Sequence, residues 1–447
     1  MTDNGKRNKS ILGQNFLFQP GVIDDIHIKA DLGRYRMRGM ALFKTIPTWD
    51  DLTFLPGTLT RFVIEGYREK CLTKTIIGPK AKRPLELDIP IYITGMSFGS
   101  LSYEAKVSLA RGATMAGTAT CSGEGGMLPD ERRYSSKWLY QCIQSRYGFN
   151  PHHLRLADGC EFFIGQGCKV GLGGHLMGQK VTDQVAEMRN LPAGIDQRSP
   201  ARHPDWLGPD DLALKINEIR EATNGEIPIQ LKLGSARVYD DVRMAAKTGP
   251  DSIYLDGMEG STGAGPHLAT EETGVPGIAA IRQGRHALDD VGKTGEVSLV
   301  YAGGIRNGAD VAKALALGAD AVAIGTSAMV ALNCNRDIPD ADFEGTVGVP
   351  AGYCYHCHTG QCPVGVATQD PELRKRLNPD EAALRVYNFL HTLAIECQMM
   401  ARACGKTNVH SLEPEDLAAL TSEASAMAEV PIAGTRYTVG HPEMTRF

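Results

Sequence analysis

Short apolar runs that alternate with glycine turns and helical stretches most constrain the fold of this 447-residue chain. From residue 86 onward the runs recur regularly, and most of them are followed at once by glycine or polar residues. They occupy residues 89–93, 117–120, 162–164, 227–231, 252–255, 298–301 and 321–324. Near-continuous apolar strands separated by helices predict a parallel sheet that is buried on both faces.

The number of predicted strands comes close to the eight of a closed (β/α)8 TIM barrel. An open, doubly wound sheet is the competing architecture, but no Gly-x-Gly-x-x-Gly fingerprint follows any of these strands. We therefore predict an α/β protein in which residues 86–330 form a (β/α)8 barrel. Residues 1–85 are expected to form an N-terminal extension, and residues 331–447 a cysteine-rich segment followed by C-terminal helices.

Composition and charge argue against several classes of function. A net charge of −5 and a charged fraction of 22 % give no reason to expect nucleic acid or an anionic membrane as a partner. Residues 1–10 are polar and lack the apolar stretch of a signal peptide, and no window approaches the ~18 consecutive apolar residues of a membrane span. Eleven cysteines without a secretion signal favour a reducing compartment. We therefore expect a cytoplasmic protein.

Two glycine turns near the end of the predicted barrel have the pattern of a phosphate site. Gly303 and Gly304 follow one strand and precede a helix over 309–317, and the next strand ends at Gly325 and Thr326. Backbone N–H groups in such turns bind phosphate, and the loops after the last two strands of a barrel are their usual location. Barrels that bind FMN, inosine monophosphate or a sugar phosphate share this pattern, and two ordinary turns are the alternative.

Four cysteines gather in a short part of the chain. They are Cys334, Cys354, Cys357 and Cys362, and Pro363 follows the last of them. Thiolates at short spacing with a following proline are typical of iron–sulfur sites. Zinc is the alternative because His356 and His358 flank Cys357, although a second ligand pair at the usual zinc spacing is missing.

The order of these motifs resembles the FMN-binding synthase domain of glutamate synthase. The resemblance runs from about residue 50 to about residue 420, and it rests on residues 95–102, 121–126, 230–233, 257–264, 303–304 and 357–366. It implies an FMN-binding barrel and a C-terminal segment whose [3Fe-4S] cluster feeds electrons to the flavin. In this family, reduced FMN delivers hydride to a 2-imino acid formed from 2-oxoglutarate.

The resemblance also implies roles for individual residues. Lys232 matches a lysine beside the flavin, and Gln166 and Lys169 match a segment that lines the flavin and oxoacid sites. The positions matched to the flavin site are Met96, Ser97, Ser122, Gln166, Lys232, Ser261, Thr262, Gly303, Gly304, Gly325 and Thr326. The three cysteines matched to cluster ligands are Cys334, Cys357 and Cys362.

Two departures from the family pattern concern the cluster and the substrate. About twenty residues separate Cys334 from Cys354, and Cys354 is additional to the family's three ligands. A [4Fe-4S] cluster with Cys354 as fourth ligand therefore stays open beside [3Fe-4S]. Leu172 stands where the family has a carboxylate, so the details of substrate binding are expected to differ.

A third departure concerns the source of the amine. The family's full-length enzymes begin with a glutaminase whose first residue is a nucleophilic cysteine, whereas this chain begins with Met1 and its first cysteine is Cys71. A synthase piece of this size resembles a subunit of multi-subunit enzymes, among them the N-methylglutamate synthase of methylamine-using bacteria. This implies a hetero-oligomer with a glutaminase-like subunit and a glycine-rich β-helical subunit, and it leaves ammonia or methylamine open as the amine.

Reductive amination needs a hydride donor, a cation for the oxoacid and a group that moves a proton. Flavin supplies the hydride because no side chain can donate one. Lys232 and Lys169 are the candidate cations, and Glu124 is the candidate for proton transfer, although solvated lysines and a structural carboxylate are the alternatives.

Three hypotheses follow. The first is such an oxidoreductase, and the second is an electron-relay and assembly subunit whose substrate site has drifted, as Leu172 suggests. The third is a nucleotide-binding barrel dehydrogenase with a zinc site, in which Cys121 is a candidate nucleophile.

Overall fold

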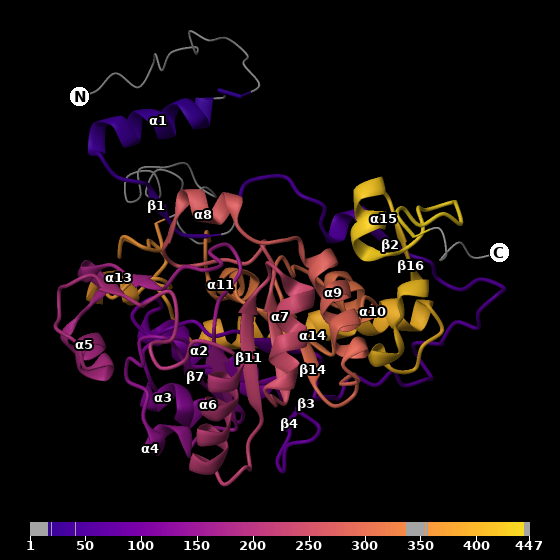
Figure 1. Cartoon of the computed structure of the whole chain (residues 1–447), viewed down its shortest axis with the longest axis horizontal. Coiled ribbons are helices and arrows are strands. Elements are labelled where there is room, and N and C mark those ends of the chain that lie inside the picture. The colour runs from indigo at the N-terminus through magenta and orange to yellow at the C-terminus, as the bar shows by residue number, and fades with distance from the viewer. Residues whose placement is uncertain (1–16, 19, 41, 337–353, 355, 442–447) are drawn as a thin grey trace.

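The computed structural model describes residues 17–18, 20–40, 42–336, 354 and 356–441. Its centre is an eight-stranded sheet with the strand order β5-β15-β14-β12-β11-β8-β7-β6, and every neighbouring pair is parallel (Figure 1). The backbone N–H of Ile93, in β5, donates to the carbonyl of Ala119, next to β6, at 3.0 Å. This bond joins the two ends of the sheet, so the predicted (β/α)8 barrel is confirmed.

The barrel strands are short, and each is followed by at least one helix. The strands are β5 (Ile91–Ile93), β6 (Thr120–Cys121), β7 (Trp138–Cys142), β8 (Gly159–Phe163), β11 (Ile229–Gly234), β12 (Ser252–Asp256), β14 (Ser298–Ala302) and β15 (Ala321–Ile324). The helices of the barrel are α2 (Tyr103–Met115), α3 (Pro129–Tyr134), α4 (Pro151–Leu154), α5 (Asp183–Arg189), α6 (Pro209–Ala222), α7 (Val238–Lys247), α8 (His267–Glu272), α9 (Gly277–Asp290), α10 (Gly308–Ala316) and α11 (Thr326–Leu332).

One of the eight strands, β7, was not predicted from the apolar runs. All five of its residues are buried, but Gln141 interrupts the apolar pattern. The Gln141 amide donates to the Glu161 carboxylate at 2.5 Å inside the barrel, and a second amide, from Gln230, donates to the same carboxylate at 2.8 Å. The polar residue of β7 is therefore satisfied by partners on neighbouring strands, which a search for apolar runs cannot detect.

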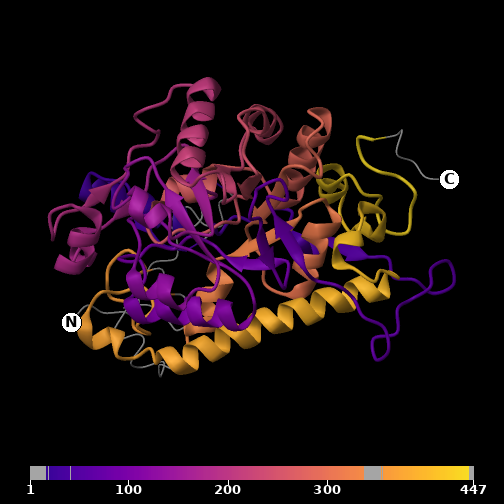
Figure 2. The same cartoon turned by 90° about the horizontal axis from the view of Figure 1, so that it is seen from below.

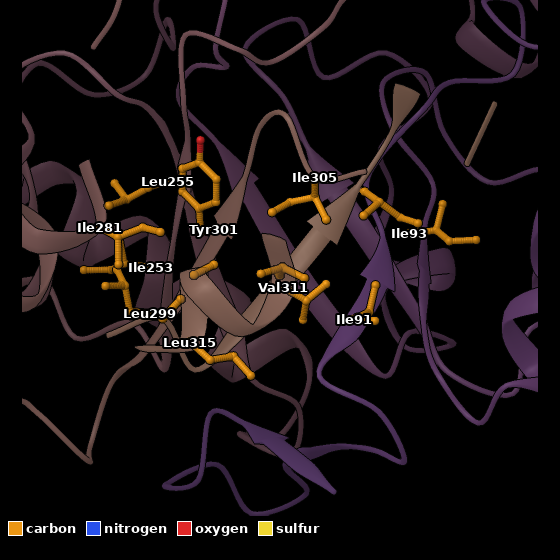
Figure 3. Packing of buried hydrophobic residues seen from close by; sticks show 14 of the residues in the cluster. Ile91, Ile93, Ile253, Leu255, Ile281, Leu299, Tyr301, Ile305, Val311 and Leu315 are labelled. Carbon is orange, nitrogen blue, oxygen red and sulfur yellow. The ribbon is translucent and has the colours of Figure 1, made fainter. Parts of the chain in front are cut away.

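Side chains along the strands alternate between the barrel interior and the surrounding helices. In β12, Ile253 and Leu255 belong to the large outer cluster, whereas Tyr254 belongs to a smaller inner one. Figure 3 shows the outer cluster, in which strand residues pack on Ile281 of α9 and Val311 of α10. The inner cluster includes residues of the hairpin formed by β3 (Thr75–Ile77) and β4 (Leu85–Leu87), which pack with the interior of the barrel.

Segments from both ends of the chain pack against the barrel. β2 (Leu52–Phe54) pairs antiparallel with β16 (Leu417–Ala419). The long helix α14 (Pro379–Ala403) lies along one side of the barrel in Figure 2, where it contacts α2, α10 and α11. None of the described helices combines the length and the apolar character that crossing a bilayer requires.

The remaining elements of the described residues lie outside the eight-stranded sheet. They are α1 (Pro20–Leu32), β1 (Met37–Arg38), β9 (His175–Leu176), β10 (Gln197–Arg198), β13 (Gly265–Pro266), α13 (Pro371–Arg374), α15 (Ser422–Ala428) and the 3-10 helices η1 (Trp49–Asp51), η2 (Gly178–Lys180), η3 (Val409–Ser411) and η4 (Pro414–Asp416).

Candidate active site

A cavity of about 710 Å³ opens at the carboxyl ends of the barrel strands. Its volume falls within the range of about 300–1,000 Å³ that is usual for small-molecule sites. The predicted site residues in its wall are Met96, Ser97, Glu124, Gln166, Lys169, Lys232, Ser261, Thr262, Gly303, Gly304, Gly325 and Thr326. Ser122 is not in this wall, since its buried hydroxyl donates to Gly123 O at 3.0 Å and accepts from the Gln141 N–H.

Lys232 brings a fixed positive charge to the floor of the cavity. Its ammonium lies 3.2 Å from the Thr94 hydroxyl, 3.4 Å from the Asp256 carboxylate and 4.3 Å from the centre of the Tyr254 ring. Burial lowers the pKa of Lys232, but the carboxylates of Asp256 and Glu161 raise it by more, so its pKa stands above the usual value. The lysine is therefore charged at neutral pH, and it is only 3 % exposed.

Lys169 and Glu124 lie on the β8 and β6 sides of the same cavity. The Lys169 ammonium is 4 % exposed and donates to Ala264 O at 3.3 Å, and burial lowers its pKa. The Glu124 carboxylate accepts a hydrogen bond from the Ser199 hydroxyl. A Cβ on Gly174 would come within 2.4 Å of a Glu124 carboxylate oxygen, so the glycine leaves the space that this carboxylate occupies.

The glycine turn after β14 contacts residues near the N-terminus of the chain. Gly303 and Gly304 have φ values of +135° and +66°, which strongly favour glycine. The Trp49 indole donates to Gly303 O at 3.3 Å, and Asp50 forms an ion pair with Arg306 at 2.7 Å. These contacts of residues 49–50 with the turn were not predicted, because the two segments are far apart in the chain.

A buried ion pair behind the cavity wall was also not predicted. Lys106 lies 2.7 Å from Glu131, and each side chain is 2 % exposed. The same ammonium donates to Met96 O at 2.6 Å and to Ser122 O at 3.0 Å. It thus ties together the loops that follow β5 and β6, including Met96 in the cavity wall. Helical spacing did not predict that this lysine faces inward.

The four predicted cluster cysteines come together. Cys334, Cys354, Cys357 and Cys362 line one small cavity whose other walls include Met329, Val364 and Val366. Burial raises the pKa of Cys357 to about 12, and burial and the neighbouring thiols also raise those of Cys334 and Cys354. Cys357 also lines the large cavity, so the two sites share a wall.

The residues present fit both groups that the sequence implied. The Ser261 hydroxyl oxygen is buried in the wall of the large cavity and has no hydrogen-bond partner within the described part of the chain. Because buried hydroxyls normally have a hydrogen-bond partner, this one suits a bound ligand. Four thiols against apolar walls suit an iron–sulfur cluster. Among the described residues, no three His, Cys, Asp or Glu side chains are placed to hold a single metal ion.

A family model for a conserved region in glutamate synthase matches residues 56–407. The chain belongs to this family. A glutamate synthase large subunit-like protein of Rhizobium meliloti (strain 1021) is 52 % identical over 424 residues, covering 95 % of this chain and 96 % of that protein. An archaeal glutamate synthase (NADPH) of Archaeoglobus fulgidus is 35 % identical over 414 residues, covering 87 % of this chain and 77 % of that protein.

The solved structure of a flavocytochrome b2 with benzoylformate covers 84 % of this chain and 77 % of its own, with a TM-score of 0.51 and 15 % identity. At this identity the likeness concerns the fold alone. The resemblance to the glutamate synthase domain is confirmed, and the chain is a glutamate synthase-type oxidoreductase. The matched region contains the barrel, the glycine turn at Gly303 and Gly304 and all four clustered cysteines.

Proposed function

We propose that the chain is the synthase subunit of a glutamate synthase-like enzyme, in which FMN binds in the large cavity. When bound, reduced FMN supplies the hydride that converts a 2-imino acid, formed from 2-oxoglutarate and ammonia or methylamine, into glutamate or N-methylglutamate. One observation carries the proposal. The glycine turn at Gly303 and two buried lysines, Lys232 and Lys169, line the same cavity.

The chain's own groups would hold the cofactor from two directions. The N–H groups of the turn at Gly303 and Gly304 suit a phosphate because they are electropositive and the turn lines the cavity. Lys232 keeps its charge through the Asp256 carboxylate and is aligned by the Thr94 hydroxyl. Such a fixed cation stabilises negative charge that develops on a bound ring system.

The substrate end of the cavity suits an oxoacid. Lys169 makes no ion pair with any described carboxylate and is nearly buried, so an anionic ligand would offset the cost of burying its charge. Glu124 is fixed by Ser199 on the opposite loop and can accept or return a proton at the amine nitrogen. We assign the oxoacid carboxylate to Lys169 and the proton transfer to Glu124.

The cysteine cavity would hold the iron–sulfur cluster that brings electrons to this site. The family pattern favours [3Fe-4S] on Cys334, Cys357 and Cys362, while the position of Cys354 in the same cavity allows [4Fe-4S]. Cys357 contributes to both cavities, which keeps the path between the two groups short. Iron and acid-labile sulfide per chain, measured for the wild type and for Cys354→Ser, distinguish the two clusters.

The nucleotide dehydrogenase alternative loses its nucleophile in this structure. Cys121 is 2 % exposed, and its thiol lies 3.7 Å from the Glu161 carboxylate inside the barrel. Burial, with Glu161 nearby, raises the pKa of Cys121 well above its usual value. A thiol in this environment stays protonated and does not line the cavity, so it is not suited to attack a substrate there.

The proposal also includes a hetero-oligomer in which a glutaminase-like subunit and a glycine-rich β-helical subunit accompany this chain. Purification of the tagged chain from its native cells, followed by mass spectrometry of the copurified chains, tests this part. Recovery of the chain as a homo-oligomer with full synthase activity would contradict it.

The central test uses protein purified without oxygen. We expect flavin absorbance together with iron and sulfide, and the chemically reduced protein should convert 2-oxoglutarate in the presence of ammonia or methylamine. Mass spectrometry of the product identifies the amine. Lys169→Met, in which flavin absorbance should persist, is the matched variant for oxoacid binding. A colourless, zinc-containing wild type would overturn the proposal.

A further inference from the structure

A buried lysine indicates that a negative charge lies or binds nearby. Burying an ammonium without an opposite charge costs much free energy. Among the described residues, four lysines are at most 4 % exposed: Lys106, Lys169, Lys180 and Lys232. Lys106 faces Glu131 at 2.7 Å, and Lys232 faces Asp256 at 3.4 Å. Within the described part of the chain, neither Lys169 nor Lys180 forms an ion pair with a carboxylate.

Lys169 faces the cavity in which an anionic substrate is proposed, but Lys180 does not line that cavity. Lys180 ends η2, and its ammonium donates to Ser100 O and to Cys357 O, each at 2.7 Å. A Cβ placed on Gly360 would lie 3.4 Å from the Lys180 stem, so the side chain also packs on the turn that carries the cysteines. Lys180 is the most deeply buried of the four, at 1 % exposure.

Burial lowers the pKa of the Lys180 ammonium to about 8, and Arg189, a positive group nearby, acts in the same direction, whereas negative charge on the sulfurs of Cys357 and Cys362 would raise it. Carbonyl oxygens satisfy its hydrogen bonds but cannot neutralise a full charge. An ammonium without a carboxylate partner in the described part of the chain therefore lies 2.7 Å from the carbonyl oxygen of Cys357, which the family pattern matches to a cluster ligand.

We propose that Lys180 is the counter-charge of the iron–sulfur cluster and raises its midpoint potential. The inference rests on the proposed function, because it requires a cluster on Cys357 and Cys362. Reduction adds one electron, from the external reductant, to the cluster, and a fixed positive charge close by stabilises the reduced form. Lys180 acts through space and through the Cys357 peptide, so it is a positioning and tuning residue rather than a ligand.

Lys180 also lies close to the wall of the large cavity, where FMN is proposed to bind. Both residues that accept its hydrogen bonds, Ser100 and Cys357, line the large cavity. The ammonium thus lies where the two proposed redox sites meet. A higher cluster potential would favour uptake of electrons at this junction.

The test compares Lys180→Met, Lys180→Gln and Lys180→Arg by redox titration of the cluster signal in electron paramagnetic resonance. Iron and sulfide per chain are measured in parallel. We expect the Met and Gln variants to have a lower midpoint potential than the wild type, and the Arg variant to stay close to it. Lys137→Met is the control, because it removes a lysine whose ammonium donates to Gly117 O before β6 and which lines neither cavity. Its cluster potential should equal that of the wild type.

A purely structural Lys180 predicts a different pattern. Met or Gln variants that retain iron and keep the wild-type potential would overturn the inference. If Lys180→Met loses its iron, Lys180→Gln decides, since an amide can still donate to the carbonyls but carries no charge. Loss of iron from both neutral variants with retention in Lys180→Arg supports the counter-charge, whereas loss from all three overturns it. A wild type without iron would instead refute the proposed function.

Discussion

Replacing Lys106 by Met removes a buried ammonium that ties two loops of the cavity wall together. The ammonium is 2.6 Å from Met96 O, 3.0 Å from Ser122 O and 2.7 Å from the Glu131 carboxylate. Methionine keeps most of the apolar stem, so the variant changes the charge and the hydrogen bonds far more than the packing. It leaves Glu131 buried without its cation.

Breaking a buried ion pair by removing one partner costs about 3–5 kcal/mol. The entropy of unfolding is roughly 2.1 cal/mol/K per residue, which gives about 0.9 kcal/mol/K for 447 residues. The thermal midpoint of Lys106→Met should therefore fall by about 3–5 °C relative to the wild type.

Differential scanning calorimetry at mildly alkaline pH measures this shift for Lys106→Met, Glu131→Leu and the double variant. Replacing both members of a buried pair by apolar residues is often close to neutral, so the double variant should be more stable than Lys106→Met. Because Met96 lies in the cavity wall, the single lysine variant should also release FMN more readily. A Lys106→Met midpoint within about 1 °C of the wild type, or a double variant less stable than the single one, would refute the reasoning.

Three further outcomes are expected. Burial raises the pKa of Glu131 from 4.5 to about 7. Between these values the folded state holds a proton that the unfolded chain has lost, so the thermal midpoint of the wild type relative to Glu131→Gln should fall as pH rises from about 5 to about 7. A pH-independent difference would contradict this. In Gly123→Ala the new Cβ would meet the Ser97 nitrogen at 2.5 Å, so flavin content should drop, whereas Gly171→Ala, also at positive φ but with open space, should keep it. Lys169→Met should raise the KM for 2-oxoglutarate by roughly 10- to 100-fold with flavin retained, and an unchanged KM would remove Lys169 from the oxoacid site.

The sequence predicted the barrel because its determinants are local. An apolar run marks a buried strand wherever its neighbours lie, and the turn at Gly303 and Gly304 needs conformations that favour glycine. β7 was missed because Gln141 has its partner on another strand, at Glu161. Strand pairing, which a single run does not reveal, decides whether a polar residue can be buried.

The site was predicted less completely, because contacts between residues that are far apart in the chain are not visible in a local sequence pattern. Residues quoted from glycine-rich motifs mostly reached the cavity wall, since those motifs form the strand ends. Ser122 belongs to such a motif, yet its hydroxyl turns toward the Gln141 backbone instead. The charges that support the site, Asp256 beside Lys232 and Glu131 beside Lys106, were invisible because each pair joins residues more than twenty positions apart.

The apolar residue at position 172 bears on whether this chain is an enzyme or only an electron relay. Leu172 is 40 % exposed and does not belong to the cavity wall, whereas Lys169, three residues earlier, does. The loop keeps Gly174, whose missing side chain leaves room for the Glu124 carboxylate. A carboxylate and a lysine therefore still share the cavity without any contribution from residue 172. Leu172, which suggested a drifted substrate site, lies outside the cavity wall, so it gives no support to a relay, and the pair of Lys169 and Glu124 in that wall supports the proposed catalysis.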